Sequence, residues 1–330
     1  MRIGVIGAGA VGGTLAALLD RAGHDVEVTA RGAHLDAIRT DGLRVDGGWG
    51  EHTARISASE TLAPHPELVI LATKAQDAAA ALAQNSDSIG ELPVLVVQNG
   101  LGGLRVAREA LPNSPLLGGL ALFAASYLSP GRITVTAPLP LIVGADVGTA
   151  PDVLESVAQT MREAIPIEVT DDILGAQWTK LLINHVNALP AITGLSVQQV
   201  VAHAGLRRIM TASMRETVRI ARRIDVKFGR VQGVSGSVLG LVGSAPLSLG
   251  EQFPRLLARR MGDVPNPGST LQSIRRGQLT EIDYLNGAVV AEAAARLGAP
   301  VNAAIVALVH EVETTGQFLS PADVVARIPL

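Results

Sequence analysis

The chain has 330 residues, of which 48% are hydrophobic and 17% are charged, so it is long enough for two globular domains and too apolar for a disordered chain. Aromatic residues make up only 2% and the net charge is −3, which argues against a surface that binds nucleic acid. The chain has no cysteine, which excludes disulfides, thiolate metal sites and cysteine nucleophiles.

The longer apolar runs, such as residues 68–73 and 94–97, are far shorter than the roughly 20 residues that a membrane-spanning helix needs. The start of the chain has a short apolar run without the cleavage-site pattern of a signal peptide, so we interpret it as a strand. We therefore expect a soluble, cytoplasmic protein that binds neither membrane nor nucleic acid.

Charge divides the sequence into two halves. Residues 1–170 hold 11 basic and 18 acidic groups, a net charge of −7, whereas residues 171–330 hold 16 and 12, a net charge of +4. This asymmetry predicts a domain at 1–170 and a second at 171–330. Only three of the 27 basic residues are lysines, the type whose pKa can fall into the physiological range, and they are Lys74, Lys180 and Lys227.

The first half alternates short apolar runs with helical stretches, the pattern of a parallel sheet with crossover helices. Helices are expected after the first strand, up to about residue 22, and at 153–163. The predicted strands are Arg2–Ile6, Asp25–Thr29, 68–73, 94–98, 119–127, 133–136, 141–144 and 165–169. The predicted fold class is therefore α/β, with an N-terminal domain of the Rossmann type.

A glycine-rich turn follows the first strand, and it fits the pattern G-x-G-x-x-G with a helix after it. The first glycine of this pattern allows a tight turn, the second lets the backbone approach a pyrophosphate, and the third lets the helix pack on the strand. The helix N-terminus then offers N–H groups to the diphosphate. The residues predicted to bind a dinucleotide are Gly7, Ala8, Gly9, Ala10, Val11 and Gly12. The alternative is a glycine-rich turn without a ligand.

The residue that follows the second strand indicates which dinucleotide binds. An acid there holds the ribose 2′-OH of NAD, whereas a basic residue accommodates the 2′-phosphate of NADP. The strand runs into Arg31, and Glu27 lies too early to take the place of the acid. We therefore expect NADP(H), bound in part by Arg31. The alternative for Arg31 is a solvated surface residue.

Two further strand ends carry polar residues. Lys74 follows the strand at 68–73, and Asn99 follows the strand at 94–98. Ligands of open α/β sheets bind beyond the carboxyl ends of the strands. Lys74 is therefore a candidate partner of a cofactor phosphate, and Asn99 of the nicotinamide ribose or a substrate hydroxyl. The alternative for both is an ordinary loop residue.

The second half is predicted to form an all-helical domain. Helices are expected at about 172–190, 196–203, 206–228, 250–260, 270–297 and 301–315, with a short one after Ser320. The stretch at 229–250 begins with a run rich in glycine and serine. It is predicted to be a long mobile loop, either a lid or a plain surface linker.

One helix of this half carries a polar stripe. Lys180, Asn184 and Asn187 recur at i, i+4 and i+7, so they lie on one helical face, and the residues between them are largely apolar. A buried ammonium is costly unless it is paired or its pKa is depressed. Such a lysine beside a cofactor is a candidate general acid. The alternative is a lysine whose stem is packed and whose ammonium reaches water.

A second polar segment lies at 280–287. Glu281 and Asp283 are two residues apart, so on a helix they face opposite ways and only one can reach a given pocket. Upstream, Ser269 is placed either to bind a carboxylate or merely to cap the next helix.

Together these segments resemble the ketopantoate reductase (2-dehydropantoate 2-reductase) family. The matching segments are 7–13, Lys74, 98–100, 178–184 and 280–287, in the same order over essentially the whole chain. The resemblance implies a Rossmann domain and an all-helical second domain with the active site in the cleft between them. It also implies NADPH as the hydride donor to a 2-keto acid.

The resemblance further implies a role for each matching residue. Lys180 would donate a proton to the ketone oxygen, and Glu281 would bind the nicotinamide side of the cofactor and help to order Lys180. The residues implied to bind substrate or to hold the lysine are Asn99, Asn184, Asn187 and Ser269. The residues implied to bind the cofactor, beyond the glycine-rich turn, are Arg31, Lys74, Asn99, Ala124 and Glu281.

The sequence departs from the family pattern at several positions. The family has a second asparagine where this chain has Ala188, and Asn187, one place earlier, still shares the predicted face of Lys180. Ser273 and Gln278 also replace the usual residues of the family. These changes are compatible with reduction and leave the identity of the 2-keto acid open.

The resulting hypothesis is an NADPH-dependent 2-keto acid reductase of pantothenate biosynthesis. Its alternatives are a D-2-hydroxyacid dehydrogenase for another 2-keto acid and a non-catalytic NADP-binding sensor. The seven histidines, among them His185, His203 and His310, show no ligand spacing and are interpreted as isolated polar or core residues, so no metal is expected. The apolar helical half would be able to support a homodimer.

Overall fold

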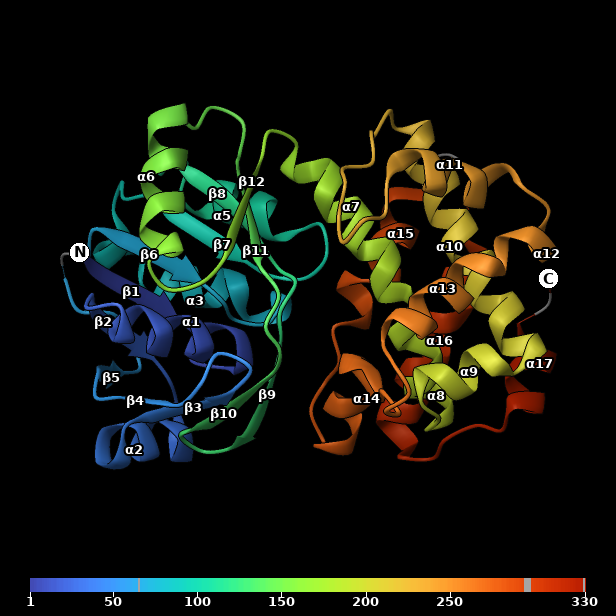
Figure 1. Ribbon diagram of the computed structural model, residues 1–330, viewed down its shortest axis with the longest axis horizontal. Helices are drawn as coiled ribbons and strands as arrows, with labels where there is room; N and C mark the ends of the chain where they lie inside the picture. The colour runs from blue at the N-terminus through green and yellow to red at the C-terminus, as the bar shows by residue number, and fades with distance from the viewer. Residues whose placement is uncertain (65, 294–297, 329) are drawn as a thin grey trace. The chain divides into compact units, whose positions relative to one another are not determined.

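The structure, a computed structural model, describes residues 1–64, 66–293, 298–328 and 330. The chain forms two compact units, Met1–Ile173 and Leu174–Leu330 (Figure 1). The first unit is α/β and the second is helical. This confirms the fold class predicted from the sequence. Within the described residues, no helix has both the length and the hydropathy that crossing a membrane requires.

An eight-stranded sheet forms the centre of the first unit, in the order β12-β11-β8-β7-β6-β1-β2-β5. Neighbouring strands are parallel, except that β8 and β11 are antiparallel. The strands are β1 Arg2–Ile6, β2 Asp25–Thr29, β5 Ser57–Ser59, β6 Leu68–Leu71, β7 Val94–Val97, β8 Leu116–Ala121, β11 Leu141–Ala145 and β12 Ile167–Thr170. All residues of β6 and β7 are buried, as expected for parallel strands covered on both faces.

Helices connect these strands, as in a doubly wound sheet. They are α1 Ala10–Arg21, α2 Gly32–Asp41, the 3₁₀ turn η1 Ala75–Asp77, α3 Ala78–Gln84, α4 Ser86–Ile89, α5 Gly103–Ala110 and α6 Pro151–Arg162. Leu15, Leu18 and Leu19 of α1 are fully buried against the core of this unit. The helix that follows the glycine-rich turn is therefore fixed by apolar packing as well as by its N-terminal glycines.

A smaller four-stranded sheet, in the order β4-β3-β10-β9, packs against α1. Its strands are β3 Leu43–Gly47, β4 His52–Ala54, β9 Ala124–Ser129 and β10 Arg132–Ala137. The single strand predicted at 119–127 is wrong, because β8 ends at Ala121 and β9 begins at Ala124 in a different sheet. Residues 120–125 are all apolar, so the pattern does not mark the point at which the chain changes sheets.

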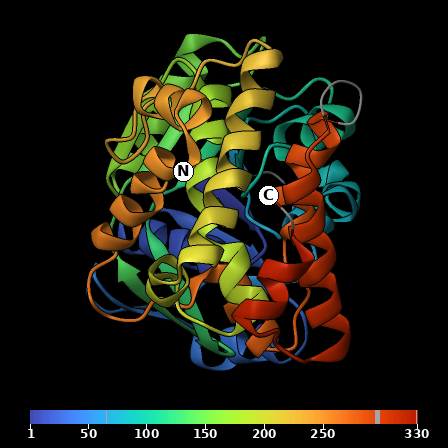
Figure 2. The same ribbon diagram turned by 90° about the vertical axis from the view of Figure 1, so that its right-hand side faces the viewer.

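The second unit is a bundle of helices in which α10 and α16 run side by side (Figure 2). Its elements are α7 Ile173–Asn184, η2 His185–Asn187, α8 Ala188–Thr193, α9 Val197–Ala202, α10 Ala204–Arg223, α11 Gly236–Ser244, α12 Leu247–Gly250, α13 Gln252–Arg260, α14 Gly268–Arg275, η3 Ile282–Tyr284, α15 Asn286–Ala293, α16 Pro300–Thr315 and α17 Pro321–Arg327. Buried apolar residues from α7, α8, α10 and α16 fill its interior.

Two helix predictions and one loop prediction for this unit are corrected. The helix predicted at 172–190 is divided into α7, η2 and α8, and the one at 270–297 is divided into α14, a turn with η3, and α15. Residues 294–297 of that prediction lie outside the described residues. The loop predicted at 229–250 is wrong over α11 and α12. Packing of α11 on α10, which buries Leu239 and Val242, outweighs the weak helix propensity of its glycines and serines.

Candidate active site

The glycine-rich turn between β1 and α1 is held by the end of β2. The N–H of Gly7 donates to the Thr29 hydroxyl at 2.9 Å, and the N–H of Ala8 donates to the Thr29 carbonyl at 3.0 Å. Gly7 has φ +98°, a conformation that favours glycine. A Cβ on Gly12 would lie 2.0 Å from the carbonyl oxygen of Gly7, so this position needs glycine for packing within the protein.

Gly9 meets a different requirement. A Cβ added there would come within 4 Å of no heavy atom in the described ranges. Gly9 is the N-cap of α1, which in the described structure has no side-chain cap and no acidic residue in its first turn. The N–H groups and partial positive charge of this helix N-terminus are therefore available to an anion. The turn fits the pyrophosphate of a dinucleotide, because a Cβ on Gly9 would occupy the space that the phosphates need.

A histidine that the sequence analysis missed supports this turn. The Nε2 of His34 lies 2.7 Å from the carbonyl oxygen of Ala8, and its Nδ1 accepts the N–H of Gly131 at 3.0 Å. A carbonyl only accepts and an amide N–H only donates, so the ring is neutral with its hydrogen on Nε2. Burial lowers the pKa of His34, and its bond to Ala8 only partly opposes this shift. The imidazole thus connects the turn to the β9–β10 hairpin.

Three other predicted cofactor residues lie at the carboxyl ends of neighbouring strands. Arg31 follows β2, Lys74 follows β6 and Asn99 follows β7; β2 and β6 flank β1 in the sheet, and β7 lies next to β6. Carboxyl ends of parallel strands share one edge, so the structure brings these residues and the glycine-rich turn to the same edge. Arg31 is exposed, and its guanidinium donates to Oε1 of Gln84 at 2.9 Å. Ala124, by contrast, lies at the start of β9 in the smaller sheet.

Gln98 joins two of these strand ends. Its Nε2 donates to the carbonyls of Thr73 at 2.9 Å and Lys74 at 3.4 Å, and it is 7% exposed. The amide therefore fixes the backbone that presents Lys74 relative to the end of β7. Gln98 belongs to the matching segment 98–100, but the sequence assigned it no role, because its partners are known only once the strand order is known.

Lys180 lies near the end of α7, between buried residues. Trp178, Thr179, Leu181 and Leu182 are each at most 2% exposed, whereas Lys180 is half-buried. Thr179 anchors the helix, since its hydroxyl lies within hydrogen-bond distance of the carbonyls of Gly175 at 3.1 Å and Gly229 at 2.7 Å. Burial lowers the pKa of Lys180 to about 8, and the Glu281 carboxylate opposes that shift. The structure thus brings the ammonium under the electrostatic influence of Glu281.

The polar stripe predicted after Lys180 is partly realised. Asn184 ends α7, and Asn187 belongs to the 3₁₀ turn η2, so the helical spacing that linked them to Lys180 does not extend to Asn187. Both are half-buried. A Cβ on Gly268 would lie 2.6 Å from Oδ1 of Asn187, so this amide packs directly against the residue before Ser269. Ser269 itself is exposed in the first turn of α14.

A buried polar network continues from the same helix. The Nδ1 of His185 accepts from Nδ2 of Asn286 at 2.9 Å, and its Nε2 lies 3.0 Å from the hydroxyl of Thr217. Nδ2 of Asn286 also donates to Oδ1 of Asn302 at 2.9 Å. Burial lowers the pKa of His185 to about 3, so the ring stays neutral. The network ties the end of the Lys180 helix to α10 and to the starts of α15 and α16.

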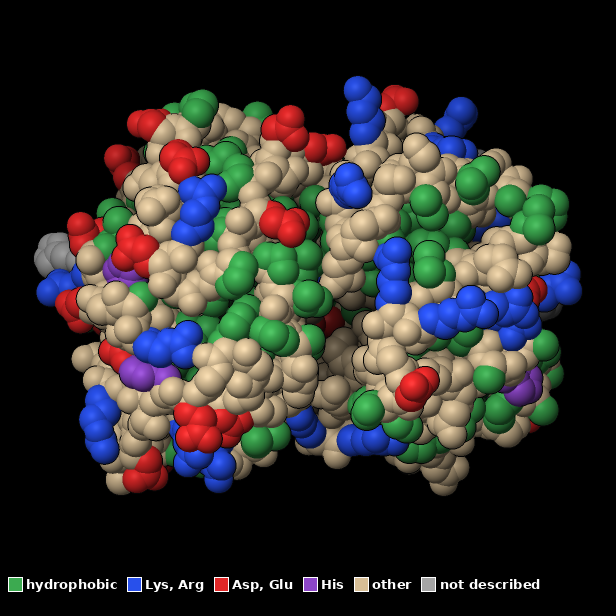
Figure 3. Space-filling model, viewed as in Figure 1, with side chains coloured by type: hydrophobic (Ala, Val, Ile, Leu, Met, Phe, Trp, Pro, Cys, Tyr) green, Lys and Arg blue, Asp and Glu red, His purple; other side chains and the backbone are tan. Residues whose placement is uncertain are grey.

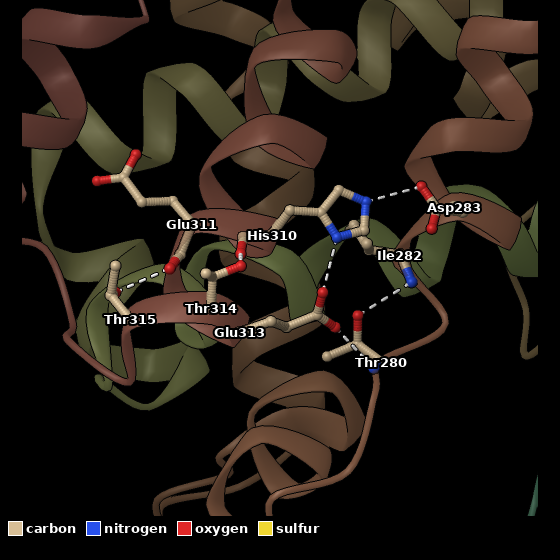
Figure 4. A network of polar contacts seen from close by, with 8 residues as sticks. All are labelled: Thr280, Ile282, Asp283, His310, Glu311, Glu313, Thr314 and Thr315. Carbon is tan, nitrogen blue, oxygen red and sulfur yellow. Dashed lines mark hydrogen bonds and ion pairs between the residues drawn. The ribbon is translucent and has the colours of Figure 1, made fainter.

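Glu281 lies in a turn and not on a helix, which corrects the argument that Glu281 and Asp283 occupy opposite helical faces. The turn is bonded to α16 through Asp283, His310, Glu313 and Thr280 (Figure 4). His310 is therefore not the isolated residue predicted from the sequence. His203 is also partnered, since its Nδ1 accepts the N–H of Leu206 at the start of α10. In the described residues, no group of three or more His, Asp or Glu side chains is placed to hold a metal ion.

The two units also differ in surface charge. On the face drawn in Figure 3, acidic side chains gather mostly on the first unit, and arginine and lysine are more frequent on the helical unit. A positive surface favours small anions, whereas the acidic first unit needs local positive charge, such as Arg31 and Lys74, to bind a phosphorylated cofactor.

Two family models match the chain. The model described as Ketopantoate reductase PanE/ApbA matches residues 3–147, and the model described as Ketopantoate reductase PanE/ApbA C terminal matches residues 172–313. The chain belongs to the ketopantoate reductase family. The resemblance predicted from the sequence is thereby confirmed.

Individual ketopantoate reductases are similar over nearly their full length. A 2-dehydropantoate 2-reductase of Pyrococcus horikoshii is 29% identical over 319 residues, which are 96% of this chain and 99% of that protein. The crystal structure of a PanE/ApbA family ketopantoate reductase from Ralstonia eutropha JMP134 is 28% identical with a TM-score of 0.81, covering 95% of this chain and 99% of that one. A D-mandelate dehydrogenase, in a structure with NADH and anilino(oxo)acetate, shares the fold with a TM-score of 0.80 at 20% identity, covering 96% and 99%.

Proposed function

We propose that this ketopantoate reductase family member reduces a small branched 2-keto acid to the 2-hydroxy acid with NADPH, and that the substrate is 2-dehydropantoate. The first unit would bind the cofactor and the helical unit would bind the keto acid. The observation that carries the proposal is Lys180, a lysine whose pKa is lowered to about 8 beside Glu281.

Bound NADPH would supply a hydride for the C2 carbonyl carbon. The choice of NADPH over NADH rests on the end of β2. Arg31 is exposed there, whereas the carboxylate of Glu27 lies earlier in the strand and accepts the N–H of Ala63 at 3.0 Å. An arginine in this place favours a ribose 2′-phosphate, and no acid takes the place that would favour a free 2′-hydroxyl. The glycine-rich turn and Lys74 would bind the phosphates.

Lys180 would donate a proton to the carbonyl oxygen as negative charge develops on it. A general acid works best with a pKa near the working pH, and a pKa of about 8 keeps most of the ammonium protonated at pH 7. Glu281 would hold the ammonium in its charged form. Asn99, Asn184, Asn187 and Ser269 would contribute hydrogen bonds to the substrate, and these donors would stabilise the developing oxyanion.

The identity of the substrate is tested by NADPH consumption at 340 nm with 2-dehydropantoate and a panel of other branched 2-keto acids, each with NADPH and NADH. We expect the highest kcat/KM with 2-dehydropantoate and NADPH. Faster reduction of another keto acid would make the protein a dehydrogenase for that acid, a result that Ala188, Ser273 or Gln278 would then explain. Tight NADPH binding without oxidation by any keto acid would indicate a sensor.

The proposal includes location and assembly. We propose a cytoplasmic enzyme, in keeping with a chain that has no cysteine, and a homodimer formed through the helical unit. Sedimentation equilibrium tests the assembly, since a dimer has twice the 34.1 kDa mass of the chain.

A further inference from the structure

The turn that carries Glu281 is bonded to α16 on both flanks. On one flank, Oδ1 of Asp283 lies 2.9 Å from Nε2 of His310. On the other flank, the N–H of Thr280 donates to Oε1 of Glu313 at 2.7 Å. His310 and Glu313 are themselves joined at 2.7 Å between Nδ1 and Oε2. A continuous chain of hydrogen bonds therefore runs from Asp283 through His310 and Glu313 to Thr280 (Figure 4), and Asp283 and Thr280 are the residues on either side of Glu281 in the sequence.

The flanks of the turn differ in how packing holds them. Thr280 is 6% exposed and Ile282 is fully buried, and the N–H of Ile282 donates to the Thr280 hydroxyl at 3.2 Å. Asp283 is exposed, so its side chain has little packing to fix it. The bond from His310 is therefore a side-chain restraint on the Asp283 side of the turn, beside the backbone bonds that the N–H groups of Tyr284 and Leu285 donate to the Glu281 carbonyl.

The partners of His310 determine its protonation state. Both ring nitrogens face carboxylate oxygens, and an ionised carboxylate only accepts hydrogen bonds, so both nitrogens must carry hydrogen. Burial lowers the pKa of His310, but hydrogen bonds and charges from Asp283 and Glu313 outweigh burial and raise it overall. For Glu313, burial raises the pKa, and bonds from Thr280 and His310 outweigh burial and lower it. The bonded form is an imidazolium between two carboxylates.

The other titratable groups near α16 are engaged elsewhere. Glu311, the next residue on the helix, pairs with Arg327 at 2.6 Å, and α8 carries no titratable residue. Glu216 of α10 accepts the N–H groups of Val301 and Asn302 at the other end of α16. The remaining titratable residues on the packed helices are Tyr284 on η3, Glu292 on α15 and Arg207, Arg208, Arg215, Arg219, Arg222 and Arg223 on α10. Asp283 and Glu313 are the charged groups that act on His310 among the described residues.

We propose that His310 is a positioning residue, which as a doubly bonded imidazolium holds the 280–283 turn against α16 and so keeps the Glu281 carboxylate in reach of the Lys180 ammonium. This inference rests on the proposed function only for the roles of Lys180 and Glu281. Because the folded-state pKa of His310 is raised, its contribution to stability is complete below the unfolded-state value of about 6.5 and is lost as the pH rises through the folded-state pKa.

The pKa of Lys180 reports the position of Glu281 without cofactor or substrate. The chain has three lysines, so competitive labelling with acetic anhydride at a series of pH values, followed by mass spectrometry, gives a pKa for each, with Lys74 and Lys227 as internal references. Glutamine in place of His310 has one donor nitrogen beside an acceptor oxygen, so it cannot place a donor where each of the two ring nitrogens lies. We expect His310→Gln to lower the pKa of Lys180 by about 0.5–1 unit, because Glu281 then raises it less. Glu311→Gln, at the neighbouring position on α16, is the matched control and should leave it unchanged.

A second variant separates positioning from a general loss of structure. In Glu313→Gln the amide oxygen can still accept the N–H of Thr280, and the amide nitrogen can donate to Nδ1 of a neutral His310. Nε2 of His310 would still donate to Asp283, so the chain of bonds is preserved with a neutral His310 ring in place of an imidazolium. We expect this variant to keep the wild-type pKa of Lys180. The ¹⁵N shifts of the His310 ring should show the imidazolium at pH 7 in the wild type and the neutral ring in Glu313→Gln.

A neutral His310 ring in the wild type at pH 7, or the same Lys180 pKa in His310→Gln as in the wild type, would overturn the inference. The NMR measurement needs only the wild-type protein, so it decides even where a variant fails to fold. Neither measurement uses NADPH or a keto acid. Failure of the proposed reduction and failure of this inference are therefore separate results.

Discussion

The candidate sites of the two units consist of different chemical groups, backbone in the first and charged side chains in the second. In the first unit, the contiguous backbone of 7–12 forms the site, and Thr29 and His34 fix it by hydrogen bonds. In the helical unit, the site consists of charged side chains far apart in the sequence, Lys180 and Glu281, and α16 holds the segment that carries one of them. Side-chain atoms added to the glycine-rich turn should therefore weaken cofactor binding in the first unit. Loss of a charged side chain should lower activity in the second.

The strongest test of this comparison is removal of the ammonium. Lys180→Ala should lower kcat for reduction of 2-dehydropantoate by roughly 10²–10⁴-fold, the range that general acid catalysis contributes. NADPH affinity, measured by fluorescence titration, should stay within about threefold, because the backbone site of the first unit is intact. Lys227→Ala, which removes an exposed lysine from the same unit, is the control and should retain wild-type kcat. A wild-type turnover in Lys180→Ala would refute the assignment of the proton donor.

Two glycines of the turn should respond differently to an added methyl group. In Gly9→Ala the new methyl group meets no atom of the described protein, so the melting temperature should be retained while NADPH affinity falls by about 10–100-fold, through the loss of close approach to the diphosphate. Gly12→Ala places its methyl group against the Gly7 carbonyl and should lower the melting temperature as well. Calorimetry and cofactor titration on both variants separate the two effects. Equal melting temperatures would contradict the distinction between the two glycines.

A charge change in the first unit should act on only one form of the cofactor. Arg31→Ala should weaken NADPH binding by about tenfold through the loss of a charge-assisted contact, and leave NADH binding nearly unchanged. Arg105→Ala removes an exposed arginine from α5 of the same unit and serves as the control. Dissociation constants for both cofactors provide the measurement. An equal loss for NADPH and NADH would mean that Arg31 does not contact the 2′-phosphate.

The site of the first unit was more accessible to sequence analysis than that of the second, for a physical reason. A strand, a glycine-rich turn and a helix follow one another in the sequence, so their pattern predicts both the local geometry and a dinucleotide site. The strands β1 and β2 were predicted with their observed bounds. The sequence did not show that His34 supports the turn, because Gly131 and Ala8 come together only in the folded unit. The change of sheet between β8 and β9 was missed because residues 120–125, which span it, are all apolar.

In the helical unit, Lys180 was singled out because lysine is rare in this chain and because its neighbours are apolar. The hydrogen bonds around the Glu281 turn were not predicted. The spacing of His310 and Glu313 at i and i+3 places them on one face of a helix, which is a weak local signal. Their partners Asp283 and Thr280 are distant in sequence, and the turn around Glu281 was assigned to a helix. Helix α11 was missed because glycine and serine disfavour a helix locally, and only packing on α10 stabilises it.

In the proposed mechanism, Lys180 transfers a proton and the Glu281 carboxylate raises the pKa of Lys180. The decisive measurement is the pH dependence of kcat/KM for 2-dehydropantoate with NADPH, in the wild type and in Glu281→Gln. Since the protonated lysine is the acid, kcat/KM should be constant at neutral pH and fall above a pKa of about 8 in the wild type. In Glu281→Gln the fall should begin at a lower pH, because the carboxylate that raises this pKa is gone. A profile that is flat up to pH 9, or the same apparent pKa in both proteins, would contradict the account.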